Sequence, residues 1–446
     1  MIQHSPLSYQ QNVQHLINKF LEDVRAIDPS KPIPAYCHNQ VDSDKVYYSG
    51  PSFDDNELAA AIKAIITGKW LSSGEKVREF EDAFSVYLNE GTMRSWPGYS
   101  VMVNSGSSAN LVMLAALKHA MGWKDGAEVI VSSVGFPTTV SAIIQNNLKP
   151  VFVDIEYDTL NFNLDDVKKA INSNTVAIFI SPVLGNPPDL NELQDMSFCN
   201  QSLVLDSCDS LGTKWDNMHI NNYAVASSYS FYPAHHITTG EGGMVTSPSS
   251  QIIEAARSIA WWGRACYCVG QANLLSCGTC KNRFSRWIPE LGHDIDHKYV
   301  FDHIGYNLKP LDLQGAIGLE QLAKIPTFES VRRFNFKLIT DVLYNVKGVK
   351  PITVHPKADV CWFGVPVICE SGEMKTKFVK HLESNGIQTR NYFAGNLLVH
   401  PAYKHLDDWK KYPNANQVLE KVFFIGCAQT ITPFQIFNIT QAIESF

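Results

Sequence analysis

The stretch Ser228–Gly243, SYSFYPAHHITTGEGG, decides how the rest of the chain is organised. The residues that lead into it, Ala224–Phe231, are apolar enough for a buried strand, and a turn with three glycines leads out of it. Glycines at such a turn let the backbone approach a ligand closely. Two histidines, His235 and His236, lie at the apex, where an imidazole can move protons near neutral pH. The stretch therefore predicts a ligand site that contains an acid–base group.

Length and composition limit the class of protein. The chain has 446 residues, which is enough for two domains and a large core. Hydrophobic residues make up 45% and charged residues 18%, as in a soluble globular protein, and the net charge is −7. No apolar run reaches the ~18 residues of a membrane span, and the N-terminus does not read as a signal peptide. We expect a cytoplasmic protein with no nucleic-acid or membrane partner.

Strand and helix patterns alternate from about Ser49 onward. Besides the strand that leads to His235, the expected strands are Val101–Asn104, Val129–Ser132, Val151–Asp154, Val176–Ser181 and Leu203–Leu205. Helical patterns between them indicate an α/β fold with a mostly parallel central sheet flanked by helices. Ligands of such sheets gather at the C-terminal ends of the strands.

Three regions are expected along the chain. They are an N-terminal helical arm at 1–48, a large cofactor-binding domain at 49–325 with a cysteine-rich insertion at 263–284, and a smaller α+β domain at 326–446. The arm carries an amphipathic helix over residues 9–27, which we expect to pack against the main domain or a partner subunit. Separate helices are predicted over 311–325 and 328–346.

Two strand ends carry candidate binding residues. The sequence SGSSAN at 105–110 follows a strand and opens a helix, where small residues and free backbone N–H groups make an anion site. Serine and asparagine also cap ordinary helices, so this signal is weak by itself. The strand candidate Leu203–Leu205 ends at Asp206, which puts a carboxylate at the edge where ligands of such sheets bind. A lone aspartate there is often structural.

Four of the ten cysteines crowd into fifteen residues; they are Cys266, Cys268, Cys277 and Cys280. In a reducing compartment such crowding favours metal binding over disulfides. Thiolates are soft ligands that suit zinc or an iron–sulfur cluster. From the spacing alone, a four-cysteine zinc knuckle is the simpler interpretation.

The residues around His235 resemble a known family. Sugar aminotransferases of the DegT/DnrJ/EryC1/StrS family read S-F-x-P-x-K-x-I-x-x-G-E-G-G, and Ser230–Gly243 matches that pattern with His235 at the lysine position. The resemblance implies pyridoxal-phosphate (PLP) fold type I. The family lysine carries the cofactor as a Schiff base, which imidazole cannot form. The expected cofactor is therefore non-covalent pyridoxamine 5′-phosphate (PMP), with His235 as the catalytic base and His236 as the alternative.

The same resemblance assigns cofactor-binding residues. They are Gly106, Ser107 and Ser108 at the phosphate, Phe136 stacked on the pyridine ring, Asp206 at the ring nitrogen, Asp209, Ser230, and Asn307, which touches the phosphate across a dimer interface. A homodimer with shared active sites is thus implied. Core packing remains the alternative for Phe136. Arg390 matches a substrate-facing loop, where it would pair with a nucleotide diphosphate or form an ordinary surface ion pair.

The cysteine-rich stretch looks like the iron–sulfur segment of the CDP-6-deoxy-L-threo-D-glycero-4-hexulose 3-dehydrases. That subgroup has histidine at the lysine position and the cluster pattern C-x57-C-x-C-x7-C. Here 57 residues separate Cys208 from Cys266, and Cys268 completes the C-x-C. The last spacing departs from the pattern, with 8 residues before Cys277 and 11 before Cys280. The flanking sequence favours Cys280 and the spacing favours Cys277; Cys280 is our choice.

The resemblance implies removal of the 3-hydroxyl from a nucleotide-linked 4-keto-6-deoxyhexose, CDP-4-keto-6-deoxyglucose first, in 3,6-dideoxysugar synthesis. A [2Fe-2S] cluster would deliver electrons singly from an NAD(P)H-dependent flavin iron–sulfur reductase. Three alternatives stay open: a TDP-sugar 3-dehydrase, a cluster-free dehydrase that releases ammonia, and a zinc-stabilised sugar-binding scaffold without catalysis.

Overall fold

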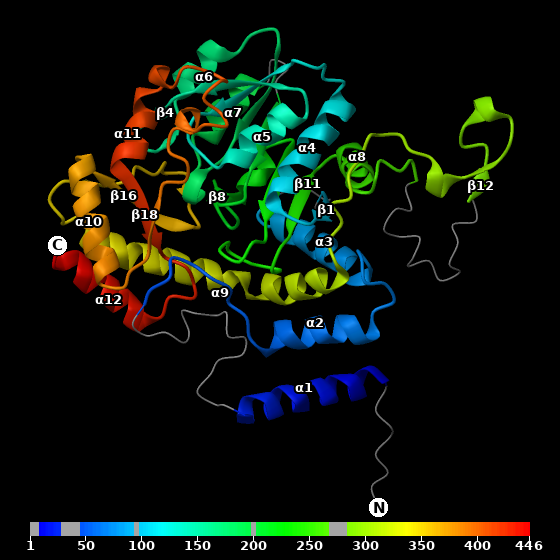
Figure 1. Cartoon of the computed structure of the whole chain (residues 1–446), viewed down its shortest axis with the longest axis horizontal. Coiled ribbons are helices and arrows are strands. Elements are labelled where there is room, and N and C mark those ends of the chain that lie inside the picture. Colours follow the sequence, from blue (N-terminus) through cyan, green and yellow to red (C-terminus); the bar gives the residue numbers. More distant parts are fainter. Residues whose placement is uncertain (1–8, 28–44, 93–97, 198–201, 267–282) are drawn as a thin grey trace, which may run out of the picture.

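Figure 1 shows the computed structural model of the chain, which describes residues 9–27, 45–92, 98–197, 202–266 and 283–446. Its centre is a seven-stranded sheet in the order β1-β11-β10-β7-β6-β2-β3. In that order, the strands are Tyr99–Val103, Gly243–Ser247, Ala226–Ser230, Ser202–Asp206, Thr175–Ile180, Glu128–Ser132 and Lys149–Val153. The pairs from β10 to β3 are parallel, and β11 is antiparallel to both neighbours. The predicted mostly parallel sheet is confirmed.

Helices cover both faces of this sheet. Side chains alternate between the two faces along each strand. Val129 and Val131 of β2 accordingly belong to the core under α4 and α8, whereas Ile130 belongs to the core under α6 and α7. The covering helices are α3 (Glu75–Leu88), α4 (Gly106–Met121), α5 (Pro137–Gln145), α6 (Leu164–Ala170), α7 (Leu190–Ser197) and α8 (Ser250–Ala260). A sheet buried on both faces explains the apolar centres of strands such as β2, β6 and β7.

A single long helix, α9 (Asp312–Leu343), runs beneath the sheet and reaches the C-terminal part of the chain (Figure 1). The two separate helices predicted on either side of Pro326 are therefore wrong. Proline removes one backbone hydrogen bond and crowds the preceding turn. Buried Ile325 and Phe328 hold the helix against its neighbours on both sides of that point, so packing outweighs the local cost. The predicted boundary at 325/326 falls inside this helix.

The C-terminal part has its own four-stranded antiparallel sheet in the order β14-β16-β18-β17. In that order, its strands are Val349–Lys350, Gly364–Cys369, Val422–Gly426 and Thr389–Asn391, and its helices are α10 (Gly372–Ser384), α11 (Pro413–Lys421) and α12 (Pro433–Glu444). This α+β arrangement agrees with the sequence-based expectation. Strand β16 begins at Gly364, and the residues directly before it, 360–363, pass beside the His235 turn.

Short strands complete the structure. They are β4 (Ile155–Glu156), β5 (Asn161–Phe162), β8 (Lys214–Trp215), β9 (Met218–His219), β12 (Phe284–Ser285), β13 (Ile295–Asp296) and β15 (Ala358–Asp359). None of the described helices is both long and apolar enough to cross a membrane.

The predicted N-terminal helix is confirmed as α1 (Tyr9–Ile27). Its buried stripe consists of Val13, Ile17 and Leu21. The stripe packs against Ala59 of α2 (Asp55–Thr67), and α2 in turn packs against α9 (Figure 1). The helix therefore packs on the main body of the chain, as the first of the two expected alternatives stated.

Glu57 of α2 is fully buried and ties that helix to α9. Lys324 Nζ lies 2.6 and 2.8 Å from its two carboxylate oxygens, and Gln321 Nε2 lies 2.7 Å from Oε1. Replacing Glu57 with alanine leaves Gln321 without this acceptor and Lys324 with only the more exposed Asp54. We expect a loss of about 3 kcal/mol in the free energy of unfolding, measured by urea denaturation.

The matched control is Glu79→Ala on α3. Glu79 pairs with Lys76 on the surface, where both side chains are about two-fifths exposed. Exposed pairs of this kind contribute ~0–1 kcal/mol. Equal losses for the two variants would show that the buried pair contributes no more than an exposed one.

Candidate active site

Asp206 is the centre of the candidate site. It ends β7, and its buried carboxylate accepts hydrogen bonds at Oδ2 from Asn110 Nδ2 (2.7 Å) and Thr139 Oγ1 (2.6 Å). Ser228 of β10 donates to Asn110 Oδ1 and so fixes that amide. The backbone N–H of Cys208 lies 3.3 Å from Oδ1. Both carboxylate oxygens therefore have a fixed orientation at the C-terminal edge of the sheet.

Asn110 and Thr139, which donate to Asp206, were not given this role from the sequence. The same holds for Ser228, which fixes the Asn110 amide. Asn110 ends the SGSSAN motif and is buried in an otherwise apolar part of α4. A buried amide on an apolar helix face needs a polar partner, and that pattern was the available signal.

The predicted phosphate residues form the first turn of α4. Ser105 caps the helix, because its Oγ accepts from the backbone N–H of Ser108 at 3.1 Å. A Cβ atom at Gly106 would lie 2.5 Å from Ser230 Cβ and 3.0 Å from Cys208 Sγ. The structure thus brings Gly106, Ser230 and Cys208 together. The remaining N–H groups of this turn have no intrahelical acceptor, which suits an anion.

Phe136 immediately precedes α5 at the same edge of the sheet. Its side chain is about half exposed, so it is not part of the core. It meets Phe393 edge-on, with ring centroids 6.1 Å apart, and Thr139 one turn later binds Asp206. The exposed ring face is therefore available to stack on a planar ligand that also reaches Asp206.

His235 lies beside Asp209, with Nδ1 3.7 Å from Asp209 Oδ1. Burial, with a smaller contribution from the positive charge of Arg332, lowers the pKa of His235 to about 3. Burial also raises the pKa of Asp209 to about 8, with the charge of Asp206 adding to the effect. At neutral pH the pair is thus a neutral imidazole next to a mostly protonated carboxyl group. A neutral imidazole is the form that can accept a proton.

His236 points to a different environment. Its Nε2 lies 3.0 Å from the backbone carbonyl oxygen of Cys361, which can only accept, so this nitrogen carries the hydrogen. The ring is fully enclosed, and burial lowers its pKa well below the usual range. This geometry favours His235 over His236 as the group that meets a ligand.

The cysteine positions are only partly described. Cys208 packs against Gly106, and burial, with the nearby charges of Asp206 and Asp209, raises the pKa of its thiol well above the usual value. Cys266 is buried, and its Sγ lies 4.0 Å from His297 Nε2. Cys268, Cys277 and Cys280 lie outside the described residues. Within the described residues no three metal-ligating side chains are gathered. The cluster ligands stay a prediction.

Asn307 and Arg390 lie on exposed segments next to the site. The carbonyl oxygen of Leu308 accepts from the N–H of Asn104 at 2.9 Å, directly before the phosphate turn. Asn307 is exposed and accepts a hydrogen bond from Lys309. Arg390 is also exposed, and its guanidinium lies 4.5 Å above the ring of Tyr48. Both side chains are therefore available to a ligand or to a second subunit.

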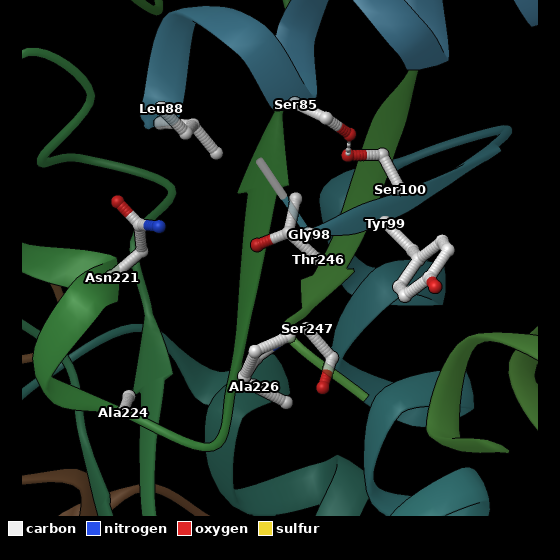
Figure 2. Close-up of a pocket in the computed structure, with 11 residues that line it drawn as sticks. Ser85, Leu88, Gly98, Tyr99, Ser100, Asn221, Ala224, Ala226, Thr246 and Ser247 are labelled. Carbon is white, nitrogen blue, oxygen red and sulfur yellow. Dashed lines mark hydrogen bonds between the residues drawn. The ribbon is translucent and has the colours of Figure 1, made fainter. Parts of the chain in front are cut away.

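A surface pocket at the opposite edge of the sheet does not belong to this site. Figure 2 shows it between the end of α3 and the start of β1, where Ser85 and Ser100 share a hydrogen bond of 2.6 Å. Ala226, the first residue of β10, also lines it. The candidate site lies at the other end of β10, so the two regions are separated by the length of that strand.

The sheet order, the helix N-terminus at a strand end and the buried aspartate define a PLP-dependent transferase of fold type I. The model of the DegT/DnrJ/EryC1/StrS aminotransferase family matches residues 52–444. The chain belongs to this family, which confirms the resemblance at that level.

Two relatives and one solved structure give the range of similar proteins. A dTDP-4-dehydro-2,6-dideoxy-D-glucose 3-dehydratase of Saccharopolyspora spinosa is 34% identical over 96% of this chain and 92% of its own length. The lipopolysaccharide biosynthesis protein RfbH of Salmonella typhimurium is 35% identical over 89% of this chain and 91% of its own length. A crystal structure of GDP-4-keto-6-deoxymannose-3-dehydratase with a trapped PLP–glutamate geminal diamine aligns with a TM-score of 0.75 at 27% identity, covering 89% of this chain and 99% of that one.

Gly106 gives a direct test of the phosphate turn. In Gly106→Ala the new methyl group would overlap Ser230 Cβ and crowd Cys208, so the turn must move. We expect the affinity for PLP, measured by absorbance titration, to fall at least about tenfold, or ~1.4 kcal/mol. Gly50→Ala is the control, since a Cβ there meets nothing within 4 Å. Unchanged affinity in Gly106→Ala would remove this turn from the binding site.

Proposed function

We propose that this chain holds PMP without a covalent bond and removes the 3-hydroxyl group of a nucleotide-linked 4-keto-6-deoxyhexose. The observation that carries the proposal is His235. It stands where the family pattern has its lysine, and it lies as a neutral imidazole beside Asp209. Such a residue cannot hold the cofactor covalently but can transfer a proton. The Saccharopolyspora relative and the solved structure are both named as 3-dehydratases, which supports this reaction class.

The residues of the site fit the three parts of PMP. The first turn of α4 would hold the phosphate, because it offers N–H groups and a glycine cradle too narrow for a Cβ. Asp206, fixed by two donors on one oxygen, would bind the protonated pyridine nitrogen. The exposed face of Phe136 would stack on the ring. The donor set therefore agrees with the cofactor of the family.

When bound, PMP supplies an amine that condenses with the C4 ketone of the sugar and a ring that delocalises electrons. His235 would remove a proton from the cofactor C4′ carbon. The imidazolium beside Asp209 would then give this proton to the departing 3-hydroxyl group, which leaves as water, so that His235 returns to its neutral form. General acid–base catalysis of this kind contributes roughly 10²–10⁴-fold.

We further propose that the reaction is reductive and uses a [2Fe-2S] cluster held by Cys208, Cys266, Cys268 and Cys280. Cys208 supports this because its thiol packs at the phosphate turn, two residues from Asp206. A cluster with a ligand there would lie near the cofactor ring and could pass it single electrons. The electrons would come from an NAD(P)H-dependent flavin iron–sulfur reductase. Cys277 stays the alternative fourth ligand.

The proposed substrate is CDP-4-keto-6-deoxyglucose, in the synthesis of 3,6-dideoxysugars for lipopolysaccharide O-antigen. The relative named as a lipopolysaccharide biosynthesis protein supports that setting. A TDP-linked sugar is the alternative that a specific observation favours, because the Saccharopolyspora relative is named for a dTDP-sugar. Turnover of CDP-, TDP- and GDP-linked 4-keto-6-deoxyhexoses side by side decides between them.

A homodimer with shared active sites is part of the proposal. The segment that contains Asn307 exposes large apolar side chains, including Tyr299, Phe301 and the fully exposed Ile304. Exposed apolar side chains grouped on one segment are typical of an interface. A second copy seated on this segment would bring its own phosphate turn close to Asn307.

Iron, acid-labile sulfide and zinc analysis of anaerobically purified protein tests the reductive reaction. We expect about two irons and two sulfides per chain with a red-brown colour, following from the [2Fe-2S] assignment. Cys266→Ser should lose iron and reductive turnover but keep PMP binding. Zinc without sulfide would instead support the scaffold, and 3-dehydration without iron would support the ammonia-releasing alternative.

His235→Lys tests the assignment of the base. The introduced lysine should form a covalent link to PLP, seen as a mass increase after borohydride reduction, while 3-dehydration falls by at least about 100-fold. His236→Lys is the matched control, because its side chain faces Cys361 rather than the site. A covalent link in the His236 variant alone would exchange the roles of the two histidines.

A further inference from the structure

The turn that carries His235 is held by side chains from three distant parts of the chain. Three consecutive backbone carbonyl oxygens each accept a hydrogen bond. Ser49 Oγ donates to Ala234 (2.6 Å), Arg332 Nη2 donates to His235 (3.4 Å), and Gln429 Nε2 donates to His236 (3.2 Å). Most buried carbonyl groups are satisfied by helices, sheets or local turns. Here, three consecutive carbonyl groups instead accept hydrogen bonds from side chains that are remote in the sequence.

Each donor comes from a different part of the chain. Ser49 follows Tyr48, whose N–H donates to Gln388 Oε1 at 3.2 Å. Gln429 lies just beyond the end of β18. Arg332 comes from the middle of α9. The position of the His235 turn therefore depends on the N-terminal segment, on α9 and on the small sheet together.

Arg332 is the most informative of the three. It is completely buried, and its Nη1 donates to the carbonyl oxygens of Trp362 (3.1 Å) and Phe363 (3.2 Å). Phe363 also packs on the imidazole of His235, with ring centroids 5.3 Å apart. No carboxylate among the described residues forms an ion pair with this guanidinium. A buried charge without an ionic partner is costly, so its contacts with the turn point to a role beyond stability.

We propose that Ser49, Arg332 and Gln429 are positioning residues that fix the His235 imidazole over the site. Since no covalent bond would tie this turn to the cofactor, these hydrogen bonds, together with that of His236 Nε2 to the Cys361 carbonyl, hold its position. The role rests on the proposed function of His235 as the proton-transferring group. Proton transfer requires near-contact geometry, and a misplacement of about 1 Å costs on the order of 100-fold in rate.

The first experiment compares steady-state kinetics of Arg332→Met, Arg332→Lys and Asn335→Leu on the same nucleotide sugar. Asn335 is the matched control, since it is buried one turn along α9 and donates to Cys427 and Ala428 without touching the turn. We expect kcat to fall about 10- to 100-fold in Arg332→Met with KM unchanged, and to recover in part in Arg332→Lys. An equal loss of kcat in Asn335→Leu would show that the effect comes from a general loss of stability.

The second readout does not depend on turnover. In the His235→Lys background, the fraction of chains linked to PLP after borohydride reduction reports how well the turn faces the cofactor. Adding Arg332→Met should lower this fraction several-fold, whereas adding Asn335→Leu should not. If Arg332→Met does not fold, Ser49→Ala and Gln429→Met remove the neighbouring hydrogen bonds and give the same comparison. Equal linkage in all of these variants would overturn the proposal.

The two readouts separate this inference from the proposed function. Reduced linkage with no 3-dehydration of any substrate would keep the positioning role and reject the reaction. Normal 3-dehydration with kcat and linkage unchanged by Arg332→Met would keep the reaction and reject the positioning role.

Discussion

The doubly hydrogen-bonded carboxylate of Asp206 is the constraint on which the rest of the site depends. A buried carboxylate is tolerated only when donors surround it, and here Asn110 and Thr139 supply them from two different helices. Those bonds fix how α4 and α5 approach the end of β7. They thereby place the phosphate turn at one end of α4 and Phe136 at the start of α5. The arrangement of the candidate site thus follows from the hydrogen bonds that one buried carboxylate requires.

The environment of His235 also follows from burial. Asp209 and His235 would form an ordinary ion pair in water, but enclosure disfavours both charges and makes the neutral pair the resting state. The pair then differs from an ion pair in one functional respect, because the imidazole lone pair stays available. A family framework whose lysine is replaced by histidine thus keeps a proton acceptor while it loses the covalent anchor.

Much of this was readable from the sequence, for identifiable reasons. The strand that ends at Asp206 has an apolar centre between polar turns, and the strand that ends at Ser230 lies within the expected run Ala224–Phe231, so both positions were predicted within two residues. The helix end predicted at Pro326 was wrong. Local propensity favours an end there, but the packing of Ile325 and Phe328 continues the helix. The contacts of Ser49, Arg332 and Gln429 with the His235 turn join residues far apart in sequence, and no spacing rule encodes such contacts.

The unbroken helix α9 has a mechanical consequence. At 1.5 Å per residue its 32 residues form a rod of about 48 Å that contacts α2 and α3 along its first half and the small sheet along its second. Because the seven-stranded and four-stranded sheets both pack against this helix, rotating one relative to the other about residue 325 would unwind the helix. The point of easiest bending is Pro326, which cannot donate a backbone hydrogen bond. Any widening of the candidate site would therefore come more readily from displacement of the surface segments around it than from separation of the two sheets, which α9 connects.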